Sequence, residues 1–265
     1  MLFAGRFVDW MDTKKGFLWA IGVWSFGAVL HAFCGIATSG IVAGEWFVGF
    51  EGAREAIGAV QNISRVASVS VILFIFARLV LAIGEAGNFP AAIKTTAEYF
   101  PKKDRALATS IFNAGATVGA LAAPITIPVI AKYWGWEMAF IIIGALGFIW
   151  MGFWVFVYKK PEVHPKVNAA ELEYIQSDQK DETPEEVAAE EDKGKKITFK
   201  QAFRYRQTWA FAFGKFMTDG VWWFFLFWAP AYLSSVYGIK SSDTAGQLAI
   251  FVLYAITLLS IIGGW

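Results

Sequence analysis

Long apolar runs separated by short charged turns dominate the first 158 residues. The run from Phe17 to Ala37 has about 21 residues and would measure about 31 Å as an α-helix, enough to cross the hydrocarbon core of a bilayer. Comparable runs occupy residues 70–97, 106–131 and 138–158. The pattern predicts membrane-spanning helices joined by short loops.

The polar segments between these runs differ in length. Gly5–Gly16, Glu98–Arg105 and Lys132–Glu137 are short enough to be turns. Residues 38–68 form a longer mixed segment, in which Phe50–Val66 is expected to be a short surface helix.

After residue 158 the pattern changes. Residues 159–206 are dense in both signs of charge, so an aqueous segment is expected, with a flexible acidic middle at 178–192 and helical turns at 169–176. Residues 207–237 form a span rich in aromatic side chains, and a last apolar run reaches Trp265. We therefore divide the chain into a helical part at 1–158, a central loop at 159–206 and a second helical part at 207–265.

Composition supports an all-α, multi-pass membrane protein. The chain is 57% hydrophobic, with a mean hydropathy of +0.48. The net charge of +1 gives no indication of a nucleic-acid partner, and a single cysteine excludes a disulfide framework. No phosphate loop, dinucleotide fingerprint or metal-ligand spacing occurs, which argues against an ATP-driven pump and a conventional enzyme, and we expect no cofactor.

Basic residues in short loops predict the orientation. Alternation of the spans places three basic loops on one side, which we expect to be the cytoplasmic side of the cell membrane, together with the central loop. The basic residues are Arg6, Lys14 and Lys15 in the first loop, Lys102, Lys103 and Arg105 in the second, and Lys159 and Lys160 in the third.

Arg78 and Glu85 lie deep inside the apolar run at 70–97. A charge at membrane depth costs about 3 kcal/mol on insertion scales and is by default a functional-site hypothesis. Seven residues are about two helical turns, so both side chains share a face. Gly84, Gly87 and Pro90 favour a closely packed, bent helix around them.

The turn from Gly5 to Lys15, GRFVDWMDTKK, resembles the cytoplasmic motif between the second and third helices of the major facilitator superfamily. That family usually has a basic residue where Trp10 stands and glycine where Asp12 stands. The resemblance implies that Asp9 caps a neighbouring helix and holds a conformational latch, with gating roles for Lys14, Lys15 and Arg105. A plain basic turn is the alternative interpretation.

A more specific resemblance, to the hexuronate and sugar-acid members of the anion:cation symporter family, covers nearly the whole chain. It implies part of a major-facilitator-type helical bundle, from the end of helix 2 to helix 8 of twelve. The motifs that carry it are Arg78, GEAGNFP at 84–90, YFPKK at 99–103, Arg105-Ala106, FNAG at 112–115, WGW at 134–136, His164-Pro165 with Glu171–Ile175, Trp222-Trp223 and WAP at 228–230.

This resemblance implies uptake of a monovalent organic acid, expected to be a hexuronate, coupled to protons. A carboxylate in a low dielectric binds protons more readily, and arginine stays charged and suits a carboxylate. Glu85 is therefore the candidate proton-coupling residue, and Arg78 is its counter-ion or a substrate contact. A structural Arg–Glu pair that fixes helix packing is the alternative.

Further candidate substrate contacts lie later in the chain. Lys215 and Asp219 are four residues apart on one helix face, and Trp222 and Trp223 follow them. Lys215 and the two tryptophans line the substrate cavity, or they form an intramembrane ion pair and an interfacial aromatic belt. Asn113 contacts substrate or bonds between helices.

Other function classes stay open at this stage. Within transport, the substrate could instead be an aldonate, a tartrate-like acid or an aromatic carboxylate. A sensor could bind the same sugar acid without moving it, and a membrane-embedded enzyme would need a catalytic constellation that the sequence does not contain. The expected partners are the organic anion, the proton and the lipid bilayer.

Overall fold

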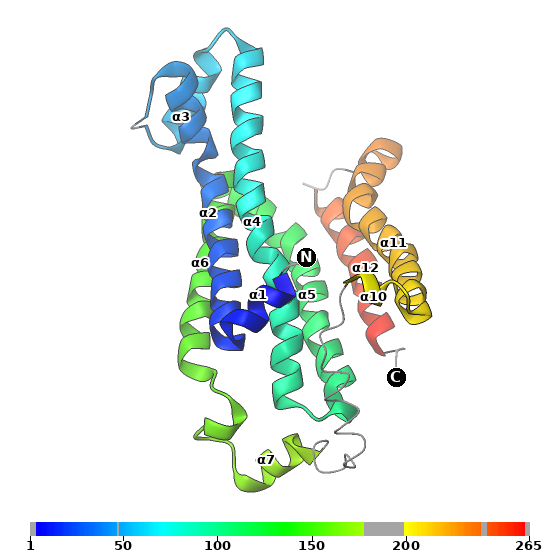
Figure 1. The fold of residues 1–265 in the computed structure, drawn as a ribbon. Coiled ribbons are helices and arrows are strands. Elements are labelled where there is room, and N and C mark those ends of the chain that lie inside the picture. The colour runs from blue at the N-terminus through cyan, green and yellow to red at the C-terminus, as the bar shows by residue number, and fades with distance from the viewer. Residues whose placement is uncertain (1–3, 47, 178–198, 240–242, 263–265) are drawn as a thin grey trace. The chain divides into compact units, whose positions relative to one another are not determined.

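The computed structural model describes residues 4–46, 48–177, 199–239 and 243–262, and every regular element within them is a helix (Figure 1). The chain forms two compact units. Unit 1 comprises Met1–Thr109 and Thr126–Leu172, and unit 2 comprises Ser110–Ile125 and Glu173–Trp265. Helix α5 (Arg105–Trp134) contributes to both units.

Unit 1 is built around α2 (Thr13–Ala43), which packs against both α4 (Ile63–Tyr99) and α6 (Trp136–Val157). The short helices α1 (Ala4–Met11) and α3 (Phe50–Ala59) also pack on α2, at its opposite ends (Figure 1).

Glycine allows α2 and α4 to approach closely. A Cβ added to Gly84 would lie 2.2 Å from the Trp24 backbone nitrogen, and one added to Gly27 would lie 2.5 Å from the Leu81 nitrogen. Small residues at such contacts let helix backbones pack together where lipid provides no hydrophobic driving force. At Gly115 and Gly119 on α5, in contrast, an added Cβ would meet no described atom within 4 Å.

The predicted spans are helical, but two of the predicted turns are much shorter than expected. Most of Gly5–Gly16 is helical, and the break between α1 and α2 falls on Asp12 alone. At Lys132–Glu137 the break is Gly135 alone, with φ of 88°. Residues at these breaks satisfy backbone groups of the adjoining helices, so a longer loop is not needed.

A helix does begin at Phe50, as predicted, but the predicted end at Val66 is wrong. Helix α3 stops at Ala59, because Val60 takes an extended conformation. Asn62 then caps α4, its side-chain oxygen accepting a hydrogen bond of 3.0 Å from the Arg65 backbone N–H.

Within the described residues, four helical segments are long and apolar enough to cross a membrane: Thr13–Ala43, Ile63–Tyr99, Lys102–Ala123 and Trp136–Val157. The segment predicted as an aromatic span forms the helix α11 (Arg206–Tyr237), but it is not among these four. Its crossing of the membrane therefore stays a prediction.

The hydrophilic segment begins with ordered short elements. A 3-10 turn at Pro161–Val163 precedes α7 (Ala169–Ile175), which confirms the helical turns predicted there. The acidic middle at 178–192 lies outside the described residues. In unit 2, α10 (Phe199–Ala202) precedes α11, and α11 packs on α12 (Thr244–Ile262).

Candidate functional site

The packing of α4 on α2 determines where its two ionisable residues lie. The buried positions of α4 are mostly small and form one face: Ala77, Leu81, Gly84, Gly87, Ala91 and Thr96. Arg78 and Glu85 lie off this face and are exposed in the described chain. The close contact with α2 is thus made by apolar and small residues.

Arg78 and Glu85 form neither a hydrogen bond nor an ion pair with each other in the part of the chain that the structure describes. They share a helix face, as predicted, but they do not constitute a structural pair between packed helices. In the described chain, neither charged group is neutralised by the other.

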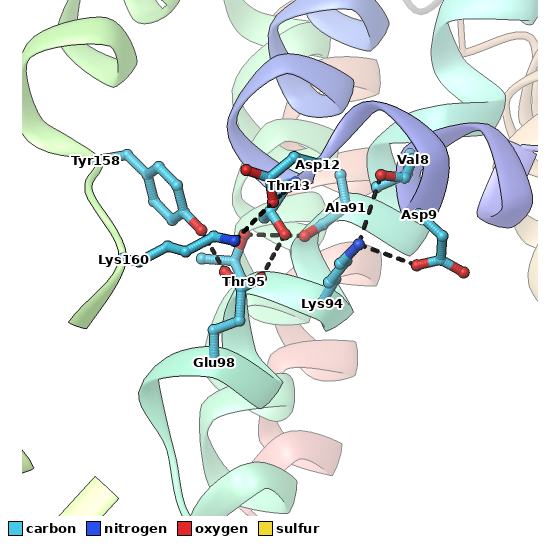
Figure 2. A network of polar contacts seen from close by, with 10 residues as sticks. All are labelled: Val8, Asp9, Asp12, Thr13, Ala91, Lys94, Thr95, Glu98, Tyr158 and Lys160. Carbon is cyan, nitrogen blue, oxygen red and sulfur yellow. Dashed lines mark hydrogen bonds and ion pairs between the residues drawn. The ribbon is translucent and has the colours of Figure 1, made fainter. Parts of the chain in front are cut away.

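A second group of polar side chains joins the ends of α2, α4 and α6 (Figure 2). We call Asp9, Asp12, Thr13, Lys94, Glu98, Tyr158 and Lys160 the end cluster. In it, Lys94 Nζ on α4 lies 3.0 Å from Asp9 Oδ1 and donates a longer hydrogen bond of 3.5 Å to the Val8 carbonyl. Within the described residues Asp9 thus binds α4, and a different aspartate caps a helix.

That capping residue is Asp12. Its carboxylate accepts a 2.9 Å hydrogen bond from the Thr13 backbone N–H at the start of α2 and lies 3.2 Å from Lys160 Nζ. Its φ of 70° and ψ of 152° fall in a region that is essentially confined to glycine. This conformation explains physically why glycine suits the position that Asp12 occupies.

The electrostatics of Asp12 and Lys160 reflect their pairing. Partial burial by itself raises the pKa of Asp12, but hydrogen bonds from Thr13 and Lys160, and the positive charges of Lys160 and Lys94, together lower that pKa below its usual value. The hydrogen bond to Asp12 and its negative charge raise the pKa of Lys160. Both shifts favour the ionised pair.

Glu98, near the end of α4, accepts two hydroxyl hydrogen bonds. Thr13 Oγ1 donates to one carboxylate oxygen at 2.5 Å, and the Tyr158 hydroxyl donates to the other. Burial, the hydrogen bond to Glu98 and the charge of Glu98 raise the pKa of Tyr158, so the phenol stays protonated and remains a donor. The Glu98 carboxylate thereby links α2, α4 and the end of α6.

The other predicted gating residues make different contacts. Lys14 Nζ donates a 2.8 Å hydrogen bond to the Val155 carbonyl of α6, whereas Lys15 is exposed and makes no hydrogen bond or ion pair within the described residues. Arg105 donates to the Ala97 and Phe100 carbonyls, at 3.0 Å each. Arg105 therefore caps the end of α4.

At the opposite end of unit 1, α3 is tied to the start of α6. Glu137 is 2% exposed, and its Oε1 lies 3.6 Å from Arg54 Nε on α3. A Cβ on Gly135 would lie 2.7 Å from Glu137 Oε2, so this turn requires glycine for space as well as for its positive φ. Helix α3 is thus packed on α2 and joined to the start of α6 by an ion pair.

The remaining predicted substrate contacts belong to unit 2. Asn113 is exposed on α5, and Trp223 is 49% exposed on α11. Lys215 Nζ lies 2.7 Å from Asp219 Oδ1, one turn further along the same helix. The side chain of Trp222 lies outside the described residues.

Sequence reasoning missed Glu98, Lys94, Tyr158 and Lys160 as members of the end cluster. A usable signal was present: Lys94 and Glu98 are four residues apart at the end of an apolar run, which places them on one helix face. Their partners could not be inferred from spacing, because Glu98 is 85 residues from Thr13 and 60 from Tyr158.

No group of three or more His, Cys, Asp or Glu side chains in the described ranges could hold a metal ion. His31 is 6% exposed, and its ring stacks on Phe140 with centroids 5.0 Å apart. It is therefore a packed residue.

The helical fold, with four segments long and apolar enough to cross a membrane in its described part, indicates a multi-pass membrane protein. The family model of the Major Facilitator Superfamily matches residues 1–265. The chain belongs to this superfamily, which confirms the predicted fold class.

The curated relatives include sugar-acid transporters. The chain is 32% identical over 262 residues to the "Hexuronate transporter" of Escherichia coli (strain K12), covering 99% of this chain and 51% of the relative. It is 32% identical over 189 residues to the "Galacturonate transporter" of Dickeya chrysanthemi, covering 71% and 53%. It is 33% identical over 176 residues to the "Probable galactarate/D-glucarate transporter GarP" of Escherichia coli (strain K12), covering 64% and 39%. The chain spans about half the length of the first two relatives.

Proposed function

We propose that the protein, in its full-length form, is a secondary active transporter that takes up hexuronates or related sugar acids together with protons across the cell membrane. The observation that carries this proposal is the pair of exposed ionisable residues on α4, Arg78 and Glu85, which are not paired with each other and lie within the apolar stretch of that helix. Residues in such positions are costly unless they bind something that moves. The named activities of the relatives supply the class of substrate.

The roles of the two residues follow from their chemistry. The guanidinium of Arg78 stays charged and offers planar donors that match a sugar carboxylate. Glu85 takes up and releases the proton. A monovalent anion and a proton that move together carry no net charge, which lowers the electrostatic cost of crossing the bilayer.

Asn113 on α5, and Lys215, Trp222 and Trp223 on α11, are proposed to complete the substrate site. Lys215 is held by Asp219, so an incoming carboxylate competes with Asp219 for its ammonium group. In alternating access the two halves rock around a site between them. The proposal keeps the division of the chain at 1–158, 159–206 and 207–265.

We place the end cluster and the central loop on the cytoplasmic side. The basic residues of the first, second and third short loops support this orientation by the positive-inside rule. The contact of Asp12 with Lys160 joins the first and third loops, and that of Glu98 with Tyr158 joins the second loop to the start of the third, so both support a common side for all three. The end cluster, with Lys14 and Arg105, is proposed to hold α2, α4 and α6 together as one rigid body while the halves move.

Substrate class is tested with the full-length protein in liposomes. We expect uptake of radiolabelled galacturonate, with competition by unlabelled glucuronate. Strong competition by galactarate or an aldonate, with none by glucuronate, would be consistent with a transporter but would reject hexuronates as its substrates. Retained galacturonate binding without counterflow would reject transport and indicate a sensor.

The role of Arg78 is tested with Arg78→Lys, which keeps the charge but loses the planar donors. This variant should raise the half-saturation concentration for galacturonate about tenfold or more, the effect of about 1.4 kcal/mol.

A further inference from the structure

Asn88 on α4 has a buried hydrogen-bond acceptor without a donor. Its side chain is only partly buried, but its Oδ1 is closed off from solvent and has no partner within the described residues. Buried polar atoms in native structures nearly always have a partner, and an exception calls for an explanation. A donor that is present in only one state of the protein would account for the unpaired oxygen.

The position of Asn88 on the helix restricts which donor can reach it. Asn88 follows Glu85 by three residues, a spacing that places the Cβ atoms about 5–6 Å apart on an α-helix. Helical side chains lean toward the N-terminus, so that of Asn88 extends back over the turn that carries Glu85. Glu85 is therefore the nearest titratable neighbour of Asn88 along α4.

The helices packed on α4 offer few other titratable groups at this level. Gly84 and Gly87 contact α2 at Ala20 and Trp24, and α2 carries no charged or titratable side chain from Gly16 to Leu30. Helix α1 carries Arg6 and Asp9, and Asp9 pairs with Lys94. On α4 itself, Arg78 lies about two turns before Glu85, and Lys94 lies beyond Pro90.

The chemistry of the two side chains explains the missing bond. An ionised carboxylate only accepts hydrogen bonds, as the amide oxygen does, so the two oxygens cannot bond to each other. A protonated carboxyl has an O–H that can donate. A substrate hydroxyl, in contrast, would have to reach an oxygen that is already closed off from solvent.

We infer that Asn88 is a positioning residue for proton coupling, whose Oδ1 accepts a hydrogen bond from the protonated form of Glu85. The inference rests on the proposed function, in which Glu85 carries the proton. When Glu85 takes a proton, its new O–H donates to Asn88; when the proton leaves, that hydrogen bond is lost. Asn88 thus stabilises the proton-loaded carrier.

The test is the pH profile of galacturonate uptake by the full-length protein in liposomes. Asn88→Leu has nearly the same shape but no acceptor. Without the acceptor the protonated carboxyl is less stable, so a lower pH is needed to load it. We expect the pH of half-maximal uptake to move toward acid by about half a unit to one unit, the size of one net hydrogen bond. The maximal rate at acid pH is retained.

Two further variants separate this role from a structural one. Asn88→Ala, which suits a helix interior and also lacks the acceptor, should show the same acid shift. Asn88→Gln keeps the amide and should lie closer to wild type than either. An acid shift absent from both Asn88→Leu and Asn88→Ala would overturn the inference, and so would a raised half-saturation concentration at an unmoved pH midpoint, which would make Asn88 a substrate contact.

Failure of the proposed function itself gives a different result. If Glu85→Gln keeps the full pH dependence of wild type, Glu85 does not carry the proton. Both the proposed coupling by Glu85 and the proposed role of Asn88 would then be rejected. If Glu85→Gln loses pH dependence while both Asn88 variants keep the wild-type midpoint, only the inference about Asn88 fails.

Discussion

Asp12 combines a strained backbone with two favourable side-chain contacts. Its backbone conformation costs about 1–3 kcal/mol for a residue other than glycine. Its carboxylate caps α2 and pairs with Lys160, which offsets this strain. The end cluster has thus gained an ion pair at a position where the backbone favours glycine.

Substitutions at Asp12 should separate these contributions. Asp12→Ala keeps the strain and loses the cap and the ion pair, so we expect it to be the least stable variant, with the cap alone contributing about 1 kcal/mol. Asp12→Gly loses the same contacts but also loses the strain, and should be more stable than Asp12→Ala by about 1–3 kcal/mol. Thermal unfolding in detergent measures the order, and equal stability of the two variants would contradict the account of strain.

The pH dependence of the Asp12–Lys160 pair follows from the directions of the two pKa shifts. The lowered pKa of Asp12 gives a stabilisation that is present above its unfolded value, about 4, and is lost as pH falls through the lower folded value. The raised pKa of Lys160 gives a stabilisation that is present below about pH 10.4 and is lost as pH rises through the higher folded value.

We therefore expect the stability difference between wild type and Lys160→Gln to be constant from about pH 6 to pH 9 and to shrink at strongly acid pH. Both side chains are 51% exposed, so the difference should stay below about 1 kcal/mol. Unfolding temperatures at a series of pH values measure it. A difference that grows toward acid pH would contradict the assignment.

At the scale of elements, the contact between α2 and α4 depends on glycine. Gly27→Ala would place a methyl group within 2.6 Å of the Leu81 backbone, and backbone atoms cannot move aside without separating the helices. Gly35→Ala, on the same helix, meets no described atom within 4 Å. We expect Gly27→Ala to lower the unfolding temperature clearly, whereas Gly35→Ala should leave it unchanged or raise it, because alanine favours a helix by about 1 kcal/mol. Equal effects of the two changes would rule out the close contact.

Much of the element pattern could be predicted from the sequence, because long apolar runs have few alternatives to a membrane helix. The ends of the helices could not be predicted in this way, because α4 extends beyond its apolar run at both ends, through Ile63–Val66 and Glu98–Tyr99. Arg78 and Glu85 were detectable because charge is rare in such a run. The contacts of Glu98 with Tyr158 and of Asp12 with Lys160 could not be detected in the sequence, because they form only when distant segments pack together.

At the scale of the whole molecule, the chain supplies α4, with the proposed coupling residues, and the end cluster that joins three of its helices. It belongs to the Major Facilitator Superfamily and covers about half of the hexuronate transporter that it resembles. In the proposed cycle the cluster keeps α2, α4 and α6 together while Arg78 and Glu85 bind anion and proton. The central claim is that Glu85 couples the two movements.

The most direct test is accumulation of radiolabelled galacturonate in liposomes that contain the full-length protein, with and without an inward proton gradient. The account predicts accumulation above equilibrium in wild type only when the gradient is present. In Glu85→Gln it predicts loss of accumulation while exchange of internal for external galacturonate persists. Accumulation by Glu85→Gln that still follows the proton gradient would contradict the account and remove α4 from the coupling mechanism.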